Sequence, residues 1–363
     1  MLKITIIAGA RPNFMKIAPI IHAIQNTNRA LDISFRLVHT GQHYDAKMSH
    51  TFFQQLNIPE PDVNLNCGGG SQAEQTAAIM VAFEKELIAH PTDLVLVVGD
   101  VTSTMACSIV AKKLQIKVAH VEAGIRSFDL SMPEEINRMV TDAITDYFFT
   151  TTVSAGENLK KAGIEDHRIF FVGNVMIDTL EANRLKFEPP QFWNELALKD
   201  KNYFVLTLHR PANVDQVDNL NALITEICTN VNGLPILFPI HPRTSIILRE
   251  SGISAPNLHV IEPLGYHQFN YLVAHAMAVV TDSGGITEEA TVMGIPCMTL
   301  RDNTERPETV DVGTNVLVGT NPKAIKPAME KLFSGNWKKG AIPELWDGKS
   351  AQRIINHIIQ MSS

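Results

Sequence analysis

The chain of 363 residues is long enough for two domains, and its 45% hydrophobic and 19% charged residues are typical of a globular enzyme. A formal net charge of −7 argues against nucleic acid as the main partner, which would require a basic face. Four widely spaced cysteines without a Cys-x-x-Cys pair indicate a reducing compartment rather than a disulfide framework. Because no signal peptide or long apolar segment is recognisable, we expect a cytoplasmic protein with no membrane partner.

The first half of the chain alternates apolar runs with helical patterns. Uninterrupted apolar runs are typical of central strands in a parallel sheet. They predict strands at 3–8, 34–40, 93–99, 118–121, 146–151 and 168–172. Helical spacing between these runs predicts helices that include 72–89, 105–114 and one that opens near Pro133.

Basic residues follow the first predicted strand. Pro12 suits the first turn of a helix, and Arg11 and Lys16 lie beside the carboxyl end of the strand, where open α/β sheets bind ligands. We interpret both as ligand-binding cations, the alternative being solvated surface charges. Gln42 and His43, after the second strand, fit a crevice lining and ordinary turn chemistry equally well.

Three carboxylates follow the next strands. Asp100 comes after 93–99, Glu122 comes after 118–121, and Glu134 lies in the first turn of the next helix. Two of them have a structural alternative, because Asp100 could cap a helix and Glu134 could match a helix dipole. Together they would lie along one crevice, where crowding raises the pKa of one carboxyl so that it can exchange protons near neutrality.

The alternation restarts after a predicted linker at 180–190, with strands at 203–208, 235–240, 276–280 and 296–300. His209 leaves the first of these strands beside Arg210, and His241 leaves the second. A functional and a structural role for His209 are about equally favoured. We therefore predict two doubly wound Rossmann-like α/β domains, at 1–175 and 176–349, that face each other across a cleft, with helix 350–363 returning to the first.

The segment 281–290 organises the second half. Ser283, Gly284 and Gly285 are predicted to form a turn between the strand 276–280 and a helix at 288–293. Glycines admit a ligand to the backbone, and a helix N-terminus attracts anions, so this turn predicts a diphosphate site. Glu289 would repel phosphate and is predicted to accept ribose hydroxyls. With the charged run 301–308, the turn favours a nucleotide or nucleotide-sugar site over a capped helix and a solvated loop.

Several familiar sites have no counterpart in the sequence. No His, Asp or Glu group has metal-ligand spacing, and no Gly-x-Gly-x-x-Gly, P-loop or Gly-x-Ser-x-Gly motif is present. We predict neither a metal nor a redox cofactor.

Nine motifs stand in one order along almost the whole chain: Gly9-Ala10-Arg11-Pro12 with Lys16, Thr40-Gly41-Gln42-His43, Gly99-Asp100, His120-Val121-Glu122-Ala123-Gly124, Pro133-Glu134-Glu135-Ile136-Asn137-Arg138, Leu208-His209-Arg210, His241-Pro242, Thr281-Asp282-Ser283-Gly284-Gly285 with Glu288-Glu289, and Arg301-Asp302 with Thr304-Glu305-Arg306-Pro307-Glu308. In combination they resemble the non-hydrolysing UDP-N-acetylglucosamine 2-epimerase family. The resemblance implies a GT-B-like fold, a homodimer and reversible inversion at C2 to give UDP-N-acetylmannosamine. It implies a role in making bacterial surface polysaccharide precursors, without metal or redox cofactor.

The resemblance also implies a mechanism and roles. UDP leaves C1 and a proton leaves C2 to give 2-acetamidoglucal, and UDP and a proton then add back on the opposite face of C2. Asp100, Glu122 and Glu134 are the candidate proton handlers. His209 is also counted as catalytic. The substrate ligands are Arg11, Lys16, His209, Phe269, Ser283, Gly284, Gly285, Glu289 and Arg306.

Three other functions fit parts of the sequence. They are a hydrolysing epimerase that releases free N-acetylmannosamine, a GT-B glycosyltransferase that needs an acceptor, and a nucleotide-sugar sensor without turnover. Family members that act on other UDP-2-acetamido sugars share most of these motifs, so the exact sugar stays open. Activation by a second substrate molecule stays open as well.

Overall fold

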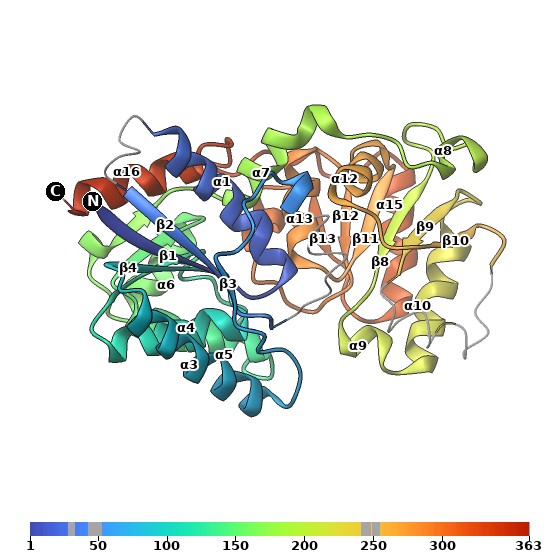
Figure 1. Cartoon of the computed structure of the whole chain (residues 1–363). Coiled ribbons are helices and arrows are strands. Elements are labelled where there is room, and N and C mark those ends of the chain that lie inside the picture. Colours follow the sequence, from blue (N-terminus) through green and yellow to red (C-terminus); the bar gives the residue numbers. More distant parts are fainter. Residues whose placement is uncertain (28–32, 43–52, 241–247, 249–254, 363) are drawn as a thin grey trace. The chain divides into compact units, whose positions relative to one another are not determined.

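The computed structural model describes the chain except for residues 28–32, 43–52, 241–247, 249–254 and 363. The chain forms two compact units (Figure 1). Unit 1 comprises Met1–Ala182 and Glu344–Ser363, and unit 2 comprises Asn183–Pro343. None of the helices in the described residues has the length and apolar character needed to cross a lipid bilayer.

Unit 1 is built on a seven-stranded parallel sheet in the order β3-β2-β1-β4-β5-β6-β7. The strands are β1 Leu2–Ala8, β2 Ile33–His39, β3 Val63–Asn64, β4 Leu94–Val98, β5 Lys117–Val121, β6 Tyr147–Thr150 and β7 Ile169–Phe171. The helices are α1 Arg11–Asn26, α3 Gln72–Ala89, α4 Thr102–Lys113, α5 Pro133–Ile144, α6 Val153–Lys161, α7 Val175–Asn183 and α16 Ser350–Ser362, with a 3-10 turn at Asp166–Arg168.

The core of unit 1 explains its central strands. Every residue of β4 is buried, and Val95 and Val97 pack with Ile79 and Phe83 of α3 on one face of the sheet. A strand covered on both faces requires the continuous apolar run that the sequence shows. The order of the sheet reverses between β1 and β4, so the switch point where α/β folds bind ligands lies at the carboxyl ends of these two strands.

Unit 2 repeats this plan with a six-stranded parallel sheet in the order β10-β9-β8-β11-β12-β13. The strands are β8 Phe204–Thr207, β9 Ile236–Pro239, β10 Leu258–Ile261, β11 Ala278–Thr281, β12 Cys297–Thr299 and β13 Asn315–Leu317. The helices are α8 Phe192–Glu195, α9 Pro211–Val214, α10 Val217–Asn230, α12 Tyr266–His275, α13 Gly284–Val292, α14 Pro307–Asp311 and α15 Ile325–Phe333, with 3-10 turns at Arg184–Lys186 and Pro322–Ala324.

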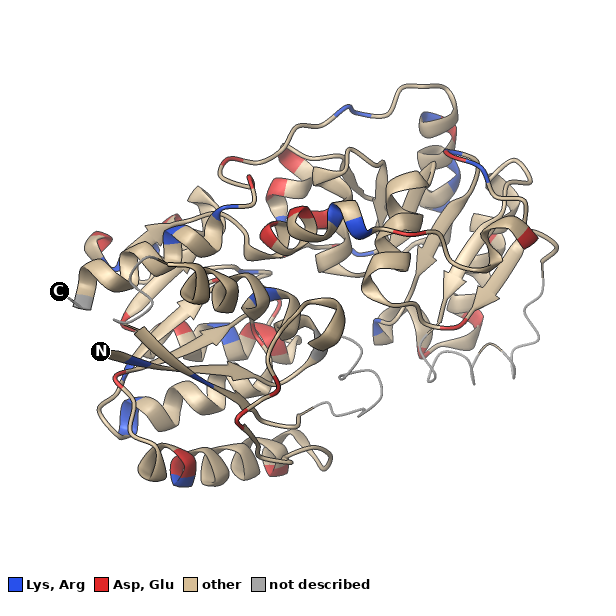
Figure 2. Cartoon of the chain, turned by 45° about the horizontal axis from the view of Figure 1, so that its top comes forward, with Lys and Arg blue, Asp and Glu red and all other residues tan. Residues whose placement is uncertain are grey.

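Helices cover both faces of this second sheet. Phe204 and Leu206 of β8 point into a core shared with α10 and α15, whereas Val205 points into a core shared with α12 and α13. The switch point of unit 2 lies between β8 and β11. Strands in both units are mostly uncharged, and Lys, Arg, Asp and Glu concentrate on helices and loops (Figure 2). The predicted α/β class with two doubly wound parallel sheets is confirmed.

The division between the units differs from the predicted boundaries at 175 and 349. Helix α7 belongs to unit 1, because Asp178 accepts hydrogen bonds from the backbone N–H groups of Ser350 (3.0 Å) and Ala351 (2.7 Å). The buried Trp346 also belongs there, since its indole N–H donates to the Thr151 carbonyl at 3.1 Å. The first residues of the predicted linker are therefore helical.

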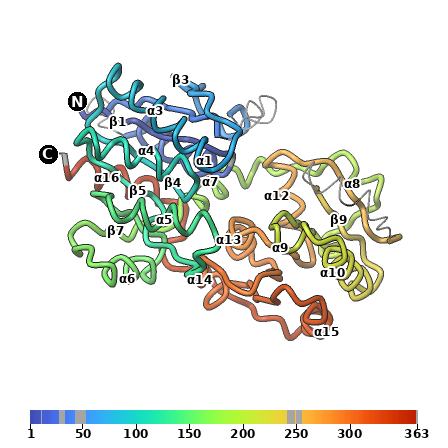
Figure 3. The backbone as a smooth tube through the Cα atoms, turned by 90° about the horizontal axis from the view of Figure 1, so that it is seen from below, coloured from blue at the N-terminus to red at the C-terminus, as the bar shows by residue number. Residues whose placement is uncertain are grey.

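The C-terminal helix lies in unit 1. Helix α16 contacts α1, and its side chains Ile354, Ile355 and Ile358 are buried. The two chain ends lie close together in this unit (Figures 1 and 3). Unit 1 is thus assembled from both ends of the sequence.

Candidate active site

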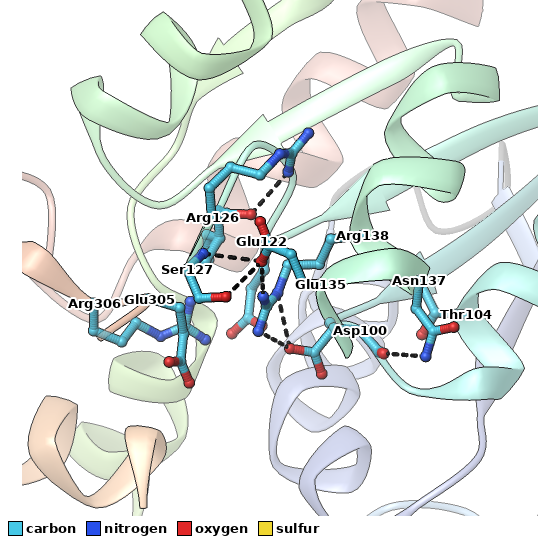
Figure 4. A network of polar contacts seen from close by, with 12 residues as sticks. Asp100, Thr104, Glu122, Arg126, Ser127, Glu135, Asn137, Arg138, Glu305 and Arg306 are labelled. Atoms are coloured by element: carbon cyan, nitrogen blue, oxygen red, sulfur yellow. Dashed lines mark hydrogen bonds and ion pairs between the residues drawn. The ribbon is translucent and has the colours of Figure 1, made fainter. Parts of the chain in front are cut away.

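Asp100 lies just beyond β4, where it is tied to helix α5. The Arg138 guanidinium donates to Asp100 Oδ2 from Nη2 at 2.8 Å and from Nε at 3.1 Å. The Asn137 side chain donates to the Asp100 carbonyl at 2.9 Å. The Arg138 side chain is 3% exposed and that of Asp100 is 24% exposed, so a buried cation holds a carboxylate that still reaches solvent (Figure 4).

Helix α5 also anchors the loop that follows β5. Glu135 accepts hydrogen bonds from the Ser127 N–H and hydroxyl, both at 2.9 Å, and from the Phe128 N–H at 3.1 Å. Its carboxylate also pairs with Arg138 (Figure 4). Glu135 therefore fixes the loop, and the neighbouring Glu134, the predicted proton handler, lies partly exposed on the same first turn of α5.

Glu122 leaves β5 in a left-handed backbone conformation, with φ of 71°. Its Oε2 lies 2.5 Å from Lys16 Nζ, and the two side chains are 1% and 9% exposed. A Cβ atom on Gly99 would lie 2.8 Å from Lys16 Nζ, so the glycine leaves room for this ion pair. Two predicted site residues thus meet, and Lys16 is a buried partner of Glu122 rather than a solvated surface cation.

Sequence reasoning missed a buried network beneath these carboxylates. His120 Nδ1 lies 2.7 Å from Asp142 Oδ1, and His120 Nε2 lies 2.8 Å from the Gly99 carbonyl oxygen. Arg126 pairs with Asp142 Oδ2 at 2.6 Å. His120, on β5, therefore links the backbone before Asp100 to Asp142 of helix α5.

The charge state of Asp142 follows from these contacts. Burial acts to raise its pKa, but the hydrogen bonds and charges of His120 and Arg126 outweigh burial and lower the pKa below its usual value. A histidine inside an apolar strand needs a polar partner, and this was the available sequence signal for the network.

The loop after β8 in unit 2 is organised by Asp282, which is fully buried at the end of β11. Asp282 accepts hydrogen bonds from the backbone N–H groups of His209 (3.0 and 3.1 Å) and Arg210 (2.9 Å), and from the Asn213 amide at 3.1 Å. His209 Nδ1 lies 2.7 Å from Asp282 Oδ1. Burial acts to raise the pKa of Asp282, but these contacts outweigh it and lower the pKa.

The two glycines predicted as a turn belong to helix α13, which begins at Gly284. This corrects the predicted helix start near 288. A Cβ atom on Gly284 would lie 2.7 Å from Glu305 Oε1, so that carboxylate lies against the helix N-terminus. Glu305 is paired with Arg301 at 2.7 Å, and Arg210 lies 3.9 Å away.

Glu289 lies inside helix α13, more than one turn after its start at Gly284. Its side chain is buried and accepts a hydrogen bond from the Tyr266 hydroxyl at 2.9 Å. Burial raises the pKa of Glu289 to about 7, although hydrogen bonds from Tyr266 and Asn270 act to lower it. The protonated form of this carboxyl can donate to a hydroxyl oxygen, and the ionised form can accept from a hydroxyl group.

Arg306 and Phe269 are also placed within unit 2. Arg306 Nε lies 2.7 Å from Glu288 Oε1, and both side chains are buried. Sequence reasoning missed Glu288 as this partner. Phe269 lies on α12, partly buried against the core that includes Val205.

Other predicted positions are resolved in part. The Gln42 side chain accepts hydrogen bonds from the Ser103 N–H (3.0 Å) and hydroxyl (2.7 Å), which is a capping contact at the start of α4. The Arg11 backbone begins α1, but its side chain lies outside the described residues, as do His43 and 241–243. Within the described part of the chain, no group of three or more His, Cys, Asp or Glu side chains could hold a metal ion.

Comparison with known proteins places this arrangement in a family. The family model for UDP-N-acetylglucosamine 2-epimerase matches residues 25–359. A UDP-N-acetylglucosamine 2-epimerase from Methanocaldococcus jannaschii is 43% identical over 98% of both chains. A UDP-2,3-diacetamido-2,3-dideoxy-D-glucuronate 2-epimerase from Pseudomonas aeruginosa is 39% identical over 88% of both chains.

A solved structure extends the comparison to three dimensions. The M. jannaschii UDP-GlcNAc 2-epimerase in complex with UDP-GlcNAc and UDP has a TM-score of 0.89 and 42% identity, covering 99% of this chain and 100% of that one. The resemblance inferred from the motifs and the GT-B-like class are confirmed. The chain is an isomerase that belongs to the UDP-N-acetylglucosamine 2-epimerase family.

Proposed function

We propose that the chain interconverts UDP-N-acetylglucosamine and UDP-N-acetylmannosamine by inverting C2 of the sugar. The observation that carries the proposal is the emergence of Asp100 and Glu122 at adjoining strand ends beside the switch point of unit 1, each held by a buried cation. The relative with bound UDP-GlcNAc and UDP supports the choice of substrate.

The nucleotide part is assigned to unit 2. The N–H groups of Gly284 and Gly285 at the start of α13 would donate to the diphosphate, as helix N-termini commonly do. Ser283 would contribute its hydroxyl, since its N–H donates to the Thr281 hydroxyl at 2.9 Å. Glu289 would contact the ribose hydroxyls, and Phe269 would contribute apolar surface. Arg11 would add positive charge. Arg306 would bind the sugar or the pyrophosphate, and Glu288, which is paired with it, would hold its guanidinium in position.

The first half of the reaction is an elimination. A carboxylate removes the C2 proton, the C2–H electrons form the C1–C2 double bond, and the C1–O bond breaks with its electrons on UDP. The C2 hydrogen has little acidity in the substrate, so stabilisation of the departing diphosphate carries much of the barrier reduction. Re-addition reverses these steps, with a proton delivered to the opposite face of C2.

Two faces of C2 require two proton handlers, and Asp100, Glu122 and Glu134 are the candidates. Asp100 is ion-paired yet partly exposed, and Glu134 is partly exposed, so both can reach a ligand. Glu122 is buried, and its proton exchange would pass through the contact with Lys16. The assignment of each carboxylate to a face is left to mutagenesis with isotope labelling.

Product analysis in deuterated water tests this function. UDP-GlcNAc is incubated with the enzyme without an acceptor, and products are followed by proton and phosphorus NMR. We expect an equilibrium mixture of two UDP-sugars with deuterium at C2. Stoichiometric free sugar and UDP would establish a hydrolysing enzyme instead. Product without deuterium would contradict proton abstraction, and absence of turnover would favour a transferase or a sensor.

The P. aeruginosa relative supports a second candidate substrate, a 2,3-diacetamido uronate. Both sugars carry the 2-acetamido group and the UDP leaving group that the proposed chemistry uses. A competition assay with both UDP-sugars decides between them, since the preferred substrate has the higher kcat/KM. A higher kcat/KM for the uronate would change the assigned sugar substrate, and the proposed inversion at C2 would still stand.

Two further expectations from the resemblance are kept as proposals. We propose a homodimer, which light scattering coupled to gel filtration would test. We also propose that the product serves as a polysaccharide precursor. Because the M. jannaschii relative is archaeal and the P. aeruginosa relative is bacterial, we do not restrict this role to bacterial surfaces. The cytoplasmic location stays a prediction.

A further inference from the structure

We propose that Asp282 is a positioning residue for His209. It holds the imidazole with the proton on Nδ1 and so presents Nε2 as the atom that exchanges a proton with the departing nucleotide. This inference rests on the proposed function, because it requires UDP as a leaving group. It concerns a residue for which the sequence suggested no role.

The geometry of the pair fixes the tautomer. His209 Nδ1 lies 2.7 Å from Asp282 Oδ1, and the Asp282 side chain has no exposed surface. An ionised carboxylate accepts hydrogen bonds and donates none, so the hydrogen of this contact belongs to Nδ1. In a neutral ring, Nε2 is then the acceptor, and in a protonated ring it is a donor.

The carboxylate has little freedom to turn. Besides the ring, it accepts from the backbone N–H groups of His209 and Arg210 and from the Asn213 amide. Asn213 is buried, and its second amide hydrogen is directed to the Leu300 carbonyl at 3.0 Å. Rotation of the Asp282 carboxylate would break several of these bonds together, so the ring is held in one orientation.

The supporting strands are central and directly paired. β8 and β11 are neighbours at the switch point, and Thr207 faces Thr281 in register. The hydroxyl groups of these threonines lie 2.6 Å apart. His209 follows Thr207 by two residues and Asp282 follows Thr281 directly, so both members of the pair are placed by rigid strands rather than by a long loop.

The other edge of the ring faces outward. The His209 side chain is 50% exposed although its Nδ1 edge lies on a buried carboxylate, which leaves the Nε2 edge on the accessible side. Arg210, the next residue along the chain, lies 3.9 Å from Glu305, and Glu305 is paired with Arg301. The Nε2 edge is therefore available to a diphosphate oxygen.

The proposed step balances protons and electrons. As the C1–O bond breaks, its electron pair goes to the β-phosphate oxygen, and protonated His209 transfers the Nε2 proton to that oxygen. In the return direction, neutral Nε2 takes the proton back as the oxygen attacks C1. Asp282 stays ionised throughout and stabilises the protonated ring, as the aspartate does in Ser-His-Asp triads.

Nitrogen-15 NMR of labelled histidine in the full-length protein tests the tautomer without turnover. We expect the neutral His209 ring to carry its hydrogen on Nδ1 in the parent protein. In Asp282→Asn, the amide can instead donate to Nδ1, and we expect the Nε2–H tautomer to appear. An Nε2–H tautomer in the parent would overturn the proposal.

A double-mutant cycle on kcat tests whether Asp282 acts through the ring. We expect Asp282→Asn to lower kcat by about 100-fold or more with a small change in KM. In a His209→Ala background, the same substitution should have little further effect, because the ring is absent. An equal loss in both backgrounds would identify a purely structural role and overturn the proposal.

Asn213→Ala is the matched control, because it removes one hydrogen bond to Asp282 without touching the ring. We expect lower thermal stability and an unchanged His209 tautomer. A changed tautomer here would show that the loop, and not Asp282, sets the ring, which would contradict the proposal. If the parent protein shows no epimerisation, the proposed function fails. The role of Asp282 is then still decided by the His209 tautomer and by UDP affinities measured for the same four proteins of the double-mutant cycle.

Discussion

The two units share one sheet order and use the same edge of it differently. In unit 1, the strand ends beside the switch point carry carboxylates, each matched to a buried cation: Glu122 to Lys16 and Asp100 to Arg138. In unit 2, the two strand ends at the switch point carry a half-exposed histidine over a buried aspartate and the N-terminus of α13. On the proposed function, one topology would carry acid–base groups in one unit and an anion-binding surface in the other, because the residues after each strand are free to differ.

The largest effect should come from Asp100→Asn, which keeps the shape of the side chain and removes its charge. We expect kcat to fall by about 100- to 10,000-fold, because general acid–base catalysis contributes that much, while UDP affinity stays unchanged. Kinetics and calorimetric UDP titration check this separation of roles. Glu84→Gln, on the exposed side of α3, is the matched control. Parallel loss of UDP affinity would break the distinction between the units.

Lys16→Met should lower stability by about 3 kcal/mol or more, since removing one member of a buried ion pair leaves an uncompensated charge. Urea unfolding measures the change. The double variant Lys16→Met with Glu122→Gln should recover much of the loss, because neither charge then remains. A double variant as unstable as the single one would show that Lys16 contributes through packing rather than charge.

Glu289 gives unit 2 a distinctive pH dependence. Its pKa in the folded chain is about 7, above the ordinary value of 4.5, so folded protein keeps a proton that unfolded chain has released. The contribution of Glu289 to stability is therefore complete below about pH 4.5, falls as the pH rises towards 7 and is lost above that. The decline amounts to about 3 kcal/mol at most.

Glu289→Gln should remove this decline, because the amide does not ionise. The difference in unfolding free energy between parent and variant, measured from pH 4 to 8 on the ligand-free protein, isolates the effect from other titrating groups. A difference independent of pH would mean that Glu289 titrates normally in the folded protein.

The smallest effect should come from an exposed ion pair. Lys160 on α6 lies 3.4 Å from both Glu157 and Asp166, all of them largely in solvent. We expect Lys160→Ala to leave thermal stability essentially unchanged, since water screens such pairs. Differential scanning calorimetry provides the comparison with Lys16→Met. If Lys160→Ala and Lys16→Met lowered thermal stability equally, burial would not explain the stabilising effect of the Lys16–Glu122 pair.

The sequence predicted the position of a residue correctly where that position depends on a single strand or helix. The five apolar residues of β4 can occupy little else than a central strand, and Asp100 follows them directly, so its place at the sheet edge was predictable. The same holds for His209 after β8. Such predictions need no knowledge of which strands are neighbours.

Pairings between distant elements were not predictable. Lys16 and Glu122 are 106 positions apart, and their contact depends on β1, β4 and β5 lying side by side. Arg138 and Glu135 show only that one face of α5 is polar, and periodicity does not reveal that this face is buried. At Gly284, a residue usually read as a helix breaker lies inside a helix, because the carboxylate of Glu305 needs the space of a missing Cβ.

The return of α16 to unit 1 has a consequence for how the protein is made. All of unit 2, Asn183–Pro343, is synthesised before the C-terminal segment of unit 1, Glu344–Ser363. Until then, the surface of α1 that α16 contacts is exposed in the nascent chain. The α16 side chains that become buried in unit 1, Ile354, Ile355 and Ile358, have not yet been synthesised. Full burial of that surface therefore waits for the synthesis of residues 344–363. A stop codon before residue 344 would yield a complete unit 2 beside an incomplete unit 1, whose exposed apolar surface favours aggregation.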